Sequence, residues 1–170
     1  MAAALPSARR PGGYRVAVVC LGNICRSPMA HVVLEARLAD AGLGDVVEVT
    51  SSGTGGWHVG DPMDRRAAAT LATAGYDASR HRARQWTGSD ADDADLVLAM
   101  DGQNLADLAG PTARTRLFRD FDPRDPGSDV PDPYYGGDSG FEEVLAMVER
   151  TATALVYALR AEHPWGGPTP

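Results

Sequence analysis

An α/β fold is predicted, with one three-layer domain in which helices flank a four-stranded parallel sheet. A nearly continuous apolar run at residues 14–20 has the pattern of a parallel strand buried on both faces. An amphipathic run at residues 29–41 and a second strand-like run at 46–50 follow it. Because a strand, a helix and a strand in this order form a right-handed parallel unit, we expect a doubly covered sheet.

The composition limits the possible partners. The 170 residues suffice for one domain with a core, and the formal net charge of −7 argues against nucleic acid as a partner. No run approaches the ~18 apolar residues of a membrane helix, so we expect no membrane partner. Residues 1–13 lack the apolar core of a signal peptide. We therefore expect a cytoplasmic monomer, with export without a signal peptide as the alternative.

The domain is expected to span residues 14–161. Residues 1–13 are predicted to be a flexible N-terminal extension, and residues 162–170 a flexible tail. No internal repeat or second domain is evident in the sequence.

The stretch between the first strand and the first helix suits a phosphate. Residues 20–28 read Cys-Leu-Gly-Asn-Ile-Cys-Arg-Ser-Pro, and five residues separate Cys20 from Arg26. The backbone N–H groups of a tight loop form an anion nest, and the helix N-terminus adds its positive dipole end. Gly22 and Asn23 accept the positive φ angles that such a loop needs, and the planar fork of Arg26 matches two phosphate oxygens. The sequence therefore predicts a phosphate-binding loop.

In this field the Cys20 thiol is expected to ionise below its free pKa of about 8.5, which makes it a nucleophile aimed at phosphorus. The alternative is a buried cysteine at a strand end with an unrelated arginine nearby. The strand, the Gly-Asn step and the Ser-Pro step before a helix favour the nucleophile. With both cysteines of the chain in one loop and no metal-ligand spacing, we expect no disulfide scaffold, no metal and no cofactor.

The stretch from Cys20 to Pro28 resembles the signature loop of the low-molecular-weight protein tyrosine phosphatases of bacterial type, and further matches cover about residues 14–160. The resemblance implies hydrolysis of phosphotyrosine in proteins, and of aryl phosphates, through a cysteinyl-phosphate intermediate. Cys20 would be the nucleophile, and Arg26 would hold the phosphate. The remaining residues of the phosphate loop would be Leu21, Gly22, Asn23, Ile24, Cys25 and Ser27.

Three of these loop residues are expected to have further roles. The Asn23 side-chain amide would hold the loop's backbone, and the Ser27 hydroxyl would stabilise the Cys20 thiolate. Cys25 has two interpretations. It is either a small buried filler or, as the family resemblance implies, a thiol that captures an oxidised Cys20 as a reversible disulfide.

The second strand is followed by a Gly-rich loop at residues 51–60. This loop leaves the same sheet edge as the cysteine loop, so it can reach the site. By resemblance, Ser51 would brace the phosphate loop and Trp57 would pack on the phosphotyrosine ring. The plain alternative is a connection with an exposed tryptophan.

A helix is predicted to start with Asp61 as its N-cap and Pro62 at its first position, and to end at Gly75. The basic cluster at residues 79–85 is either a solvated face or part of the site. The resemblance selects His81 from it, as a residue that bridges Asn23 and Ser51.

The acidic residues 90–95 are expected to cap or precede a third strand at residues 96–100. Asp101 follows as the predicted N-cap of a short helix. By resemblance it supports the base of the site. A weaker fourth strand at residues 114–118 carries charges, which indicates a sheet edge.

Residues 119–140 are rich in Asp, Pro and Gly and contain three Asp-Pro steps. Composition does not choose among these steps. The segment Asp132-Pro-Tyr134-Tyr135-Gly resembles the family's general-acid loop, so Asp132 would protonate the leaving group while the tyrosines line the cleft. A final helix is predicted from the apolar stripe between Phe141 and Leu159.

Three rival functions remain at this point. Arsenate reductase on the same fold relays a disulfide to distant cysteines, and none follows Cys25. Phosphoarginine phosphatases of the family tend to carry Thr where Ile24 stands. A phosphate-binding module without activity would lack Cys20, Arg26 or Asp132, and all three are present. The expected partner is therefore a tyrosine-phosphorylated protein.

Overall fold

The computed structural model describes residues 4–162 and 164–165 of the 170-residue chain. Within these residues four strands form one sheet of order β2-β1-β3-β4, and every neighbouring pair is parallel. This confirms the predicted four-stranded parallel sheet, with the charged fourth strand at an edge. The strands are β1 (Tyr14–Cys20), β2 (Val47–Gly53), β3 (Leu96–Ala99) and β4 (Thr115–Leu117).

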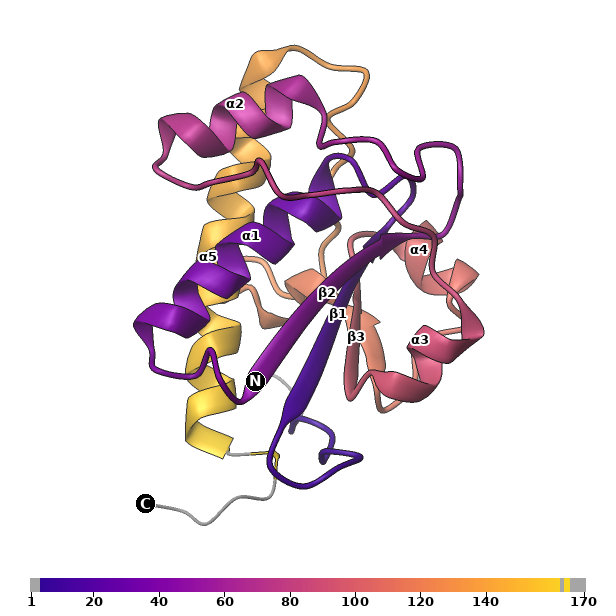
Figure 1. Ribbon diagram of the computed structural model, residues 1–170, viewed down its shortest axis with the longest axis vertical. Coiled ribbons are helices and arrows are strands. Elements are labelled where there is room, and N and C mark those ends of the chain that lie inside the picture. The colour runs from indigo at the N-terminus through magenta and orange to yellow at the C-terminus, as the bar shows by residue number, and fades with distance from the viewer. Residues whose placement is uncertain (1–3, 163, 166–170) are drawn as a thin grey trace.

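Helices cover both faces of the sheet, which gives the three predicted layers (Figure 1). One face carries α1 (Arg26–Asp40), α2 (Arg65–Thr73) and α5 (Asp138–Glu162). The other carries α3 (Gly88–Asp93) and α4 (Gly102–Asp107), while a short 3₁₀ turn, η1 (Phe118–Phe121), contacts α5. None of the described helices is both long and apolar enough to cross a membrane.

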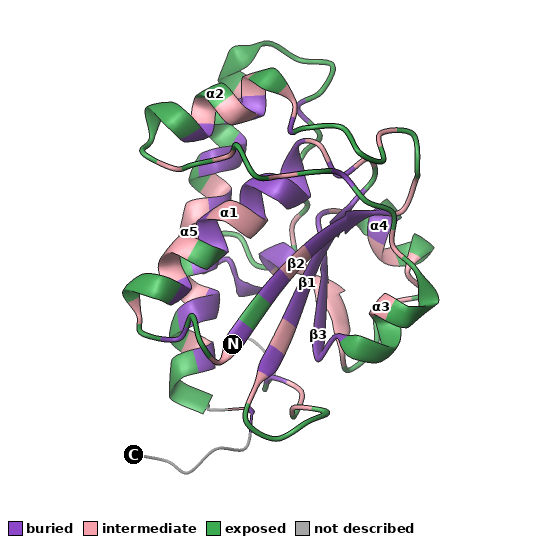
Figure 2. Ribbon diagram, in the orientation of Figure 1, coloured by how far each residue is buried: buried purple, intermediate pink, exposed green. Residues whose placement is uncertain are grey.

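Both faces of β1 are covered, so the strand is buried along almost its whole length (Figure 2). Val16 and Val18 belong to the main core beneath α1 and α5. Ala17 and Val19 face a smaller core that includes Val97. Because β1 lies between β2 and β3, its last residue is surrounded on both sides, and this residue is Cys20.

The predicted start of α2 is wrong. The helix begins at Arg65 instead of Pro62, because Asp64 is the N-cap and its side chain accepts hydrogen bonds from the backbone N–H groups of Arg66 and Ala67. The backbone N–H of Asp64 in turn donates to Ile24 O at 2.9 Å. This long-range bond holds residue 64 outside the helix. The predicted end of α2 is confirmed, since Gly75 follows the helix with a φ angle of 92°; Gly42 follows α1 in the same way with a φ angle of 73°.

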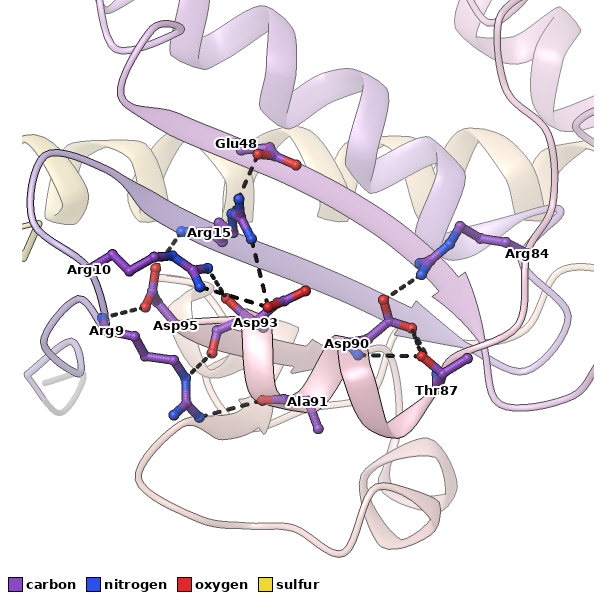
Figure 3. Close-up of polar contacts among 11 residues, drawn as sticks. Arg9, Arg10, Arg15, Glu48, Arg84, Thr87, Asp90, Ala91, Asp93 and Asp95 are labelled. Atoms are coloured by element: carbon purple, nitrogen blue, oxygen red, sulfur yellow. Dashed lines mark hydrogen bonds and ion pairs between the residues drawn. The ribbon is translucent and has the colours of Figure 1, made fainter.

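The acidic segment at residues 90–95 contains a helix that the sequence analysis missed. Thr87 and Asp90 form a capping box at the start of α3, with Thr87 N donating to Asp90 Oδ2 at 2.7 Å. Arg84 forms an ion pair with the same Asp90 carboxylate (Figure 3). Six residues suffice for a helix here because its carboxylates lie next to arginines from other segments.

Residues 4–13, expected to be a flexible extension, pack against the domain in the structure. Leu5 is buried in the main core, and the Tyr14 hydroxyl donates to Pro6 O at 2.8 Å. Arg9 N donates to Asp95 Oδ1 at 2.7 Å (Figure 3). Arg114 Nη1 donates to Ser7 O at 2.8 Å. Side chains of the domain therefore form hydrogen bonds with the backbone N–H and C=O groups of this segment, as the backbone of a neighbouring strand would in a sheet.

The expected tail also differs from the structure where it is described. Glu162 still belongs to α5, and Trp165 is buried in the main core. Gly12 N donates to Trp165 O at 3.2 Å, so the two ends of the chain pack together. Residues 1–3, 163 and 166–170 lie outside the described residues.

Candidate active site

The loop between β1 and α1 lies where the sequence predicts it, and one of its residues has a positive φ angle. Cys20 is the last residue of β1 and Arg26 is the first residue of α1. Asn23 has a φ angle of 58°, in the region that Asn tolerates better than most residues. Gly22 is not among the residues with positive φ, so the expectation holds for Asn23 alone.

The Cys20 sulfur has a hydroxyl neighbour. Ser27 Oγ lies 3.0 Å from Cys20 Sγ, and both atoms are buried. Ser27 Oγ accepts a hydrogen bond from Asn23 Nδ2 at 2.8 Å. Asn23 Oδ1 accepts one from Arg84 N at 3.0 Å, which fixes the orientation of the amide. Ser27 Oγ accepts from Asn23, and its single hydrogen has two acceptors within reach, Cys20 Sγ at 3.0 Å and Ser52 O at 3.3 Å.

Arg26 is a buried cation, with a side chain only 3% exposed. Its Nη1 donates to Asp101 Oδ2 at 2.6 Å and to Val130 O at 2.9 Å, and Nη2 lies 3.6 Å from Asp132 Oδ2. Burial alone would lower the pKa of Arg26, but the hydrogen bond to Asp101 and the charges of Cys20 and Asp132 raise it above the ordinary value. The guanidinium therefore keeps its charge next to the cysteine loop.

Asp101 has two structural tasks at this place. Besides its bond to Arg26, its Oδ1 accepts a hydrogen bond from Asn104 N at 2.8 Å, which confirms the predicted N-cap of α4. Nη1 of Arg26 is thus occupied by Asp101 and Val130. Nη2 remains directed toward Asp132.

Cys25 differs sharply from Cys20 in its surroundings. It is the N-cap of α1 and is buried. Burial, and then the negative charges of Asp64, Cys20 and Asp132, raise the pKa of the Cys25 thiol far above its usual range. Cys25 is therefore a neutral thiol at physiological pH. Both cysteines are free in the structure.

His81 lies where the resemblance placed it, but Ser51 does not contact it. His81 Nε2 is 2.7 Å from Asn23 O, and burial lowers the pKa of His81 despite this bond. Ser51 Oγ instead lies 3.1 Å from Nδ1 of His31 on α1. The expected bridge from Asn23 to Ser51 is therefore wrong. The reason is that α1 covers the face of β2 that carries the Ser51 side chain, and the carbonyl of the next residue, Ser52, is the group that accepts from Ser27 Oγ at 3.3 Å.

A cleft of about 330 Å³ opens above the loop. Trp57 and Tyr135 are largely exposed, and Tyr134 is at the border of exposure. The rings of Tyr134 and Tyr135 meet edge to face, with centroids 4.9 Å apart. The residues that line the cleft are Cys20, Leu21, Gly22, Ile24, Cys25, Arg26, Trp57, His58, Asp132, Tyr134 and Tyr135.

The structure distinguishes the three Asp-Pro steps that composition left equivalent. Asp132 lines the cleft with Cys20, its side chain is 37% exposed, and its Oδ1 accepts a hydrogen bond from Tyr134 N at 3.1 Å. Asp122 is fully buried between Arg119 and Arg150. Asp125 is exposed on the surface. Asp132 is thus the Asp of these three that a ligand in the cleft would meet.

Sequence reasoning missed Gly53, which lies beside Cys20 in the register of β1 and β2. A Cβ atom at this position would lie 2.7 Å from Leu21 O, 3.0 Å from Gly22 C and 3.1 Å from Asn23 N. The cysteine loop therefore packs directly on the backbone of β2. A glycine in a strand that ends at the same sheet edge is a signal for such close approach, but only the register shows which glycine it is.

Of the basic residues at 79–85, His81 and Arg84 are bonded to other parts of the fold. Arg84 pairs with Asp90 (Figure 3). Its Nη1 also donates to Ser51 O at 3.3 Å. The backbone N–H of Arg84 donates to Asn23 Oδ1, so this residue also stabilises the cysteine loop. Across the described residues, no three His, Cys, Asp or Glu side chains converge as a metal site would require.

Comparison with known proteins places these features in one family. The model of the family described as low molecular weight phosphotyrosine protein phosphatase matches residues 15–164. A low molecular weight protein-tyrosine-phosphatase of Streptomyces coelicolor is 52% identical over 157 residues, which cover 88% of this chain and 95% of the relative. A low molecular weight protein-tyrosine phosphatase A of Mycobacterium tuberculosis is 48% identical over 145 residues, 82% of this chain and 88% of that protein.

A solved structure is similar throughout most of the fold. The crystal structure of a protein tyrosine phosphatase from Entamoeba histolytica superposes with a TM-score of 0.83 at 31% sequence identity. The match covers 89% of this chain and 99% of the other.

Proposed function

Because the chain belongs to the low molecular weight phosphotyrosine protein phosphatase family, we propose that it hydrolyses phosphotyrosine in proteins through a cysteinyl-phosphate intermediate. One observation carries the proposal: the cleft joins Cys20, with a hydroxyl 3.0 Å from its sulfur, to a buried guanidinium and a partly exposed carboxyl group. A nucleophile, a binder of phosphate oxygens and a proton donor are the three groups that such chemistry needs.

In the first step the Cys20 thiolate attacks phosphorus, so that an S–P bond forms while the P–O bond to the aryl group breaks. The electron pair of that bond goes to the leaving oxygen, which takes a proton from the Asp132 carboxyl group. Arg26 and the backbone N–H groups of the loop stabilise the charge on the other phosphate oxygens. The Ser27 hydroxyl and the N-terminus of α1 favour negative charge on the sulfur.

In the second step the Asp132 carboxylate takes a proton from a water molecule, whose oxygen attacks phosphorus. The S–P bond breaks, its electron pair returns to Cys20, and inorganic phosphate leaves. The same carboxyl group thus acts first as acid and then as base. Its partial exposure, with only one hydrogen bond to Oδ1 and an ion pair at 3.6 Å, supports both states.

The shape of the cleft supports a preference for aryl phosphates. The sulfur lies on a buried residue, while Trp57 and the two tyrosines line the same cleft with exposed rings. A long, flat phosphotyrosine spans this depth and packs against aromatic faces, whereas a phosphoserine is too short. The metal-free reaction, the monomeric state, the cytoplasmic location and the absence of nucleic-acid or membrane partners stay predictions.

The proposal is tested with two aryl phosphates in the absence of metal. Cys20→Ser should abolish turnover of p-nitrophenyl phosphate. Asp132→Asn should lower kcat/KM for phenyl phosphate, whose leaving group is strongly basic, by about 10²–10⁴-fold, the usual contribution of a general acid. The loss should be much smaller for p-nitrophenyl phosphate, because its leaving group needs little protonation.

Asp125→Asn is the matched control, since it changes an exposed Asp-Pro step on the same loop. It should leave both rates unchanged. Turnover by Cys20→Ser, or equal losses on the two substrates in Asp132→Asn, would contradict the mechanism. Cleavage of phosphoarginine in preference to aryl phosphate would contradict the substrate.

A further inference from the structure

Arg66, the second residue of α2, contacts the loop that carries Asp132. Its Nη2 donates to Tyr134 O at 2.9 Å and its Nη1 to Gly136 O at 3.3 Å. The guanidinium carbon also lies 5.5 Å from the centroid of the Tyr134 ring and 4.7 Å from that of Phe141, in the first turn of α5. One side chain thus fixes two carbonyl groups and one ring of the loop.

The other side of Arg66 is tied to the phosphate loop. Asp64 accepts from Arg66 Nε at 3.3 Å and from Nη2 at 3.2 Å. The backbone N–H of Asp64 donates to Ile24 O at 2.9 Å. A continuous chain of hydrogen bonds therefore runs from the phosphate loop through Asp64 and Arg66 to the loop of Asp132.

The loop of Asp132 has little structure of its own to keep it in place. Residues 131–137 belong to no helix or strand. Within this loop, one turn is closed by a backbone hydrogen bond in which Gly136 N donates to Pro133 O at 3.0 Å. Without regular structure, the direction of Asp132 depends on contacts with neighbouring elements, and Arg66 supplies several of them.

Arg66 is not placed to bind the substrate. It does not line the cleft that contains Cys20, and its donors are directed at Asp64, Tyr134 and Gly136. Its role is therefore to hold the loop. We propose that Arg66 is a positioning residue that clamps the loop of Asp132 against the phosphate loop, so that the acid faces the leaving group and the Tyr134 ring stays at the cleft wall.

This inference rests on the proposed function, because it assigns Arg66 a role in the protonation of the leaving group by Asp132. A misplacement of about 1 Å can cost a factor of about 10² in rate. Arg66→Ala should accordingly lower kcat/KM for phenyl phosphate by about 10–100-fold, and for p-nitrophenyl phosphate much less. Arg66→Lys, which keeps the charge but loses the fork, should lie between the wild type and Arg66→Ala.

Two controls separate positioning from general damage to the fold. Arg65→Ala removes the neighbouring arginine of the same helix turn, which is exposed and makes no hydrogen bond or ion pair within the described part of the chain, and it should behave as wild type. The rate at which iodoacetate alkylates Cys20 should stay the same in Arg66→Ala, because Arg66 forms no bond with the nucleophile.

The decisive measurement is a double-mutant cycle. If Arg66 acts through Asp132, then Arg66→Ala should cause no further loss on phenyl phosphate in an Asp132→Asn background. Equal losses on both substrates, or full additivity with Asp132→Asn, would overturn the role of Arg66. If instead Asp132→Asn itself shows no dependence on the leaving group, the proposed function fails, whatever Arg66 does.

Discussion

Asn23 is the residue on which the geometry of the phosphate loop depends most. Its positive φ turns the backbone, its amide connects Ser27 to Arg84, and its carbonyl group accepts from His81. Glycine would adopt the same backbone angle but would lose the two side-chain bonds. Since one of these bonds orients the hydroxyl next to Cys20, the amide acts on the sulfur through Ser27.

Gly53 of β2 is a second residue on which the position of the phosphate loop depends. In Gly53→Ala the new methyl group would press on Leu21 O, 2.7 Å away, and on other backbone atoms that have no side-chain freedom. The phosphate loop must shift, so kcat/KM should fall by about 10²-fold, as expected for a small misplacement. The inhibition constant of inorganic phosphate should rise in parallel, because the loop is the proposed binding site of the anion.

Gly88→Ala is the control for this substitution. A Cβ atom at Gly88 meets nothing within 4 Å, and the residue lies in α3. The control should match the wild type in both measurements. Unchanged phosphate inhibition in Gly53→Ala would show that the loop does not depend on this contact.

At the scale of elements, a buried ion cluster anchors the segment that leads to Asp132. Asp122 accepts from Arg150 Nε at 2.8 Å, on α5, and from Arg119 Nε at 2.9 Å, on η1. Arg119 Nη1 also donates to Asp129 O at 2.7 Å, next to Val130, whose carbonyl group holds Arg26. The cluster thereby connects α5 to the active-site arginine.

The cluster predicts an acid-dependent stability. The hydrogen bond from Arg150 holds the pKa of Asp122 well below its ordinary value of 3.8. A depressed pKa contributes stability that is fully present above pH 3.8 and is lost as the pH falls below it. Asp122→Asn removes the carboxylate that Arg119 and Arg150 share, so Arg150 loses its ion pair and the buried Arg119 keeps only the exposed Asp125; it should cost about 3–5 kcal/mol at pH 7.

Denaturant unfolding at several pH values checks this prediction. The difference in unfolding free energy between wild type and Asp122→Asn should shrink as the pH falls below about 4. Asp125→Asn changes a carboxylate that is 63% exposed and pairs with the same Arg119 at 3.5 Å, and it should cost less than about 1 kcal/mol. A pH-independent difference for Asp122→Asn would refute the linkage.

At the scale of the whole molecule, the docked N-terminal segment and the active site lie at opposite ends of β1. Tyr14 begins the strand near the segment and Cys20 ends it at the cleft. A strand of seven residues spans about 20 Å. Stability and catalysis are therefore expected to be separable by truncation.

Deletion of residues 1–10 tests this separation. Burial of Leu5 alone is worth about 1.5–3 kcal/mol, and in a chain of this size each kcal/mol shifts Tm by about 2–4 °C. The truncated protein should unfold several degrees lower in calorimetry. Its kcat/KM at 25 °C should stay within about twofold of the wild type, because the hydrogen bonds of the described residues 4–10 go to residues outside the cleft. An unchanged Tm would show that this segment does not stabilise the domain.

Local patterns sufficed for most elements and for the Cys20 loop. The loop residues are contiguous, so a buried strand, a tight turn and a helix start place Cys20 and Arg26 together without knowledge of the rest of the fold. The start of α2 was missed because residue 64 is held by a carbonyl group of the phosphate loop, far away in the sequence. The docking of residues 4–13 was missed for the same reason, since their partners come from α5 and β4.

Residue patterns along the chain predicted the class of fold and the phosphate loop, and the family resemblance added the choice of Asp132. Only the tertiary structure decided that Gly53 supports the loop, that Ser51 contacts His31, and that Arg66 joins the two loops of the site. The physical reason is that periodicity and turn chemistry act over a few residues. Strand register and side-chain contacts between distant elements arise only when the whole chain packs around β1.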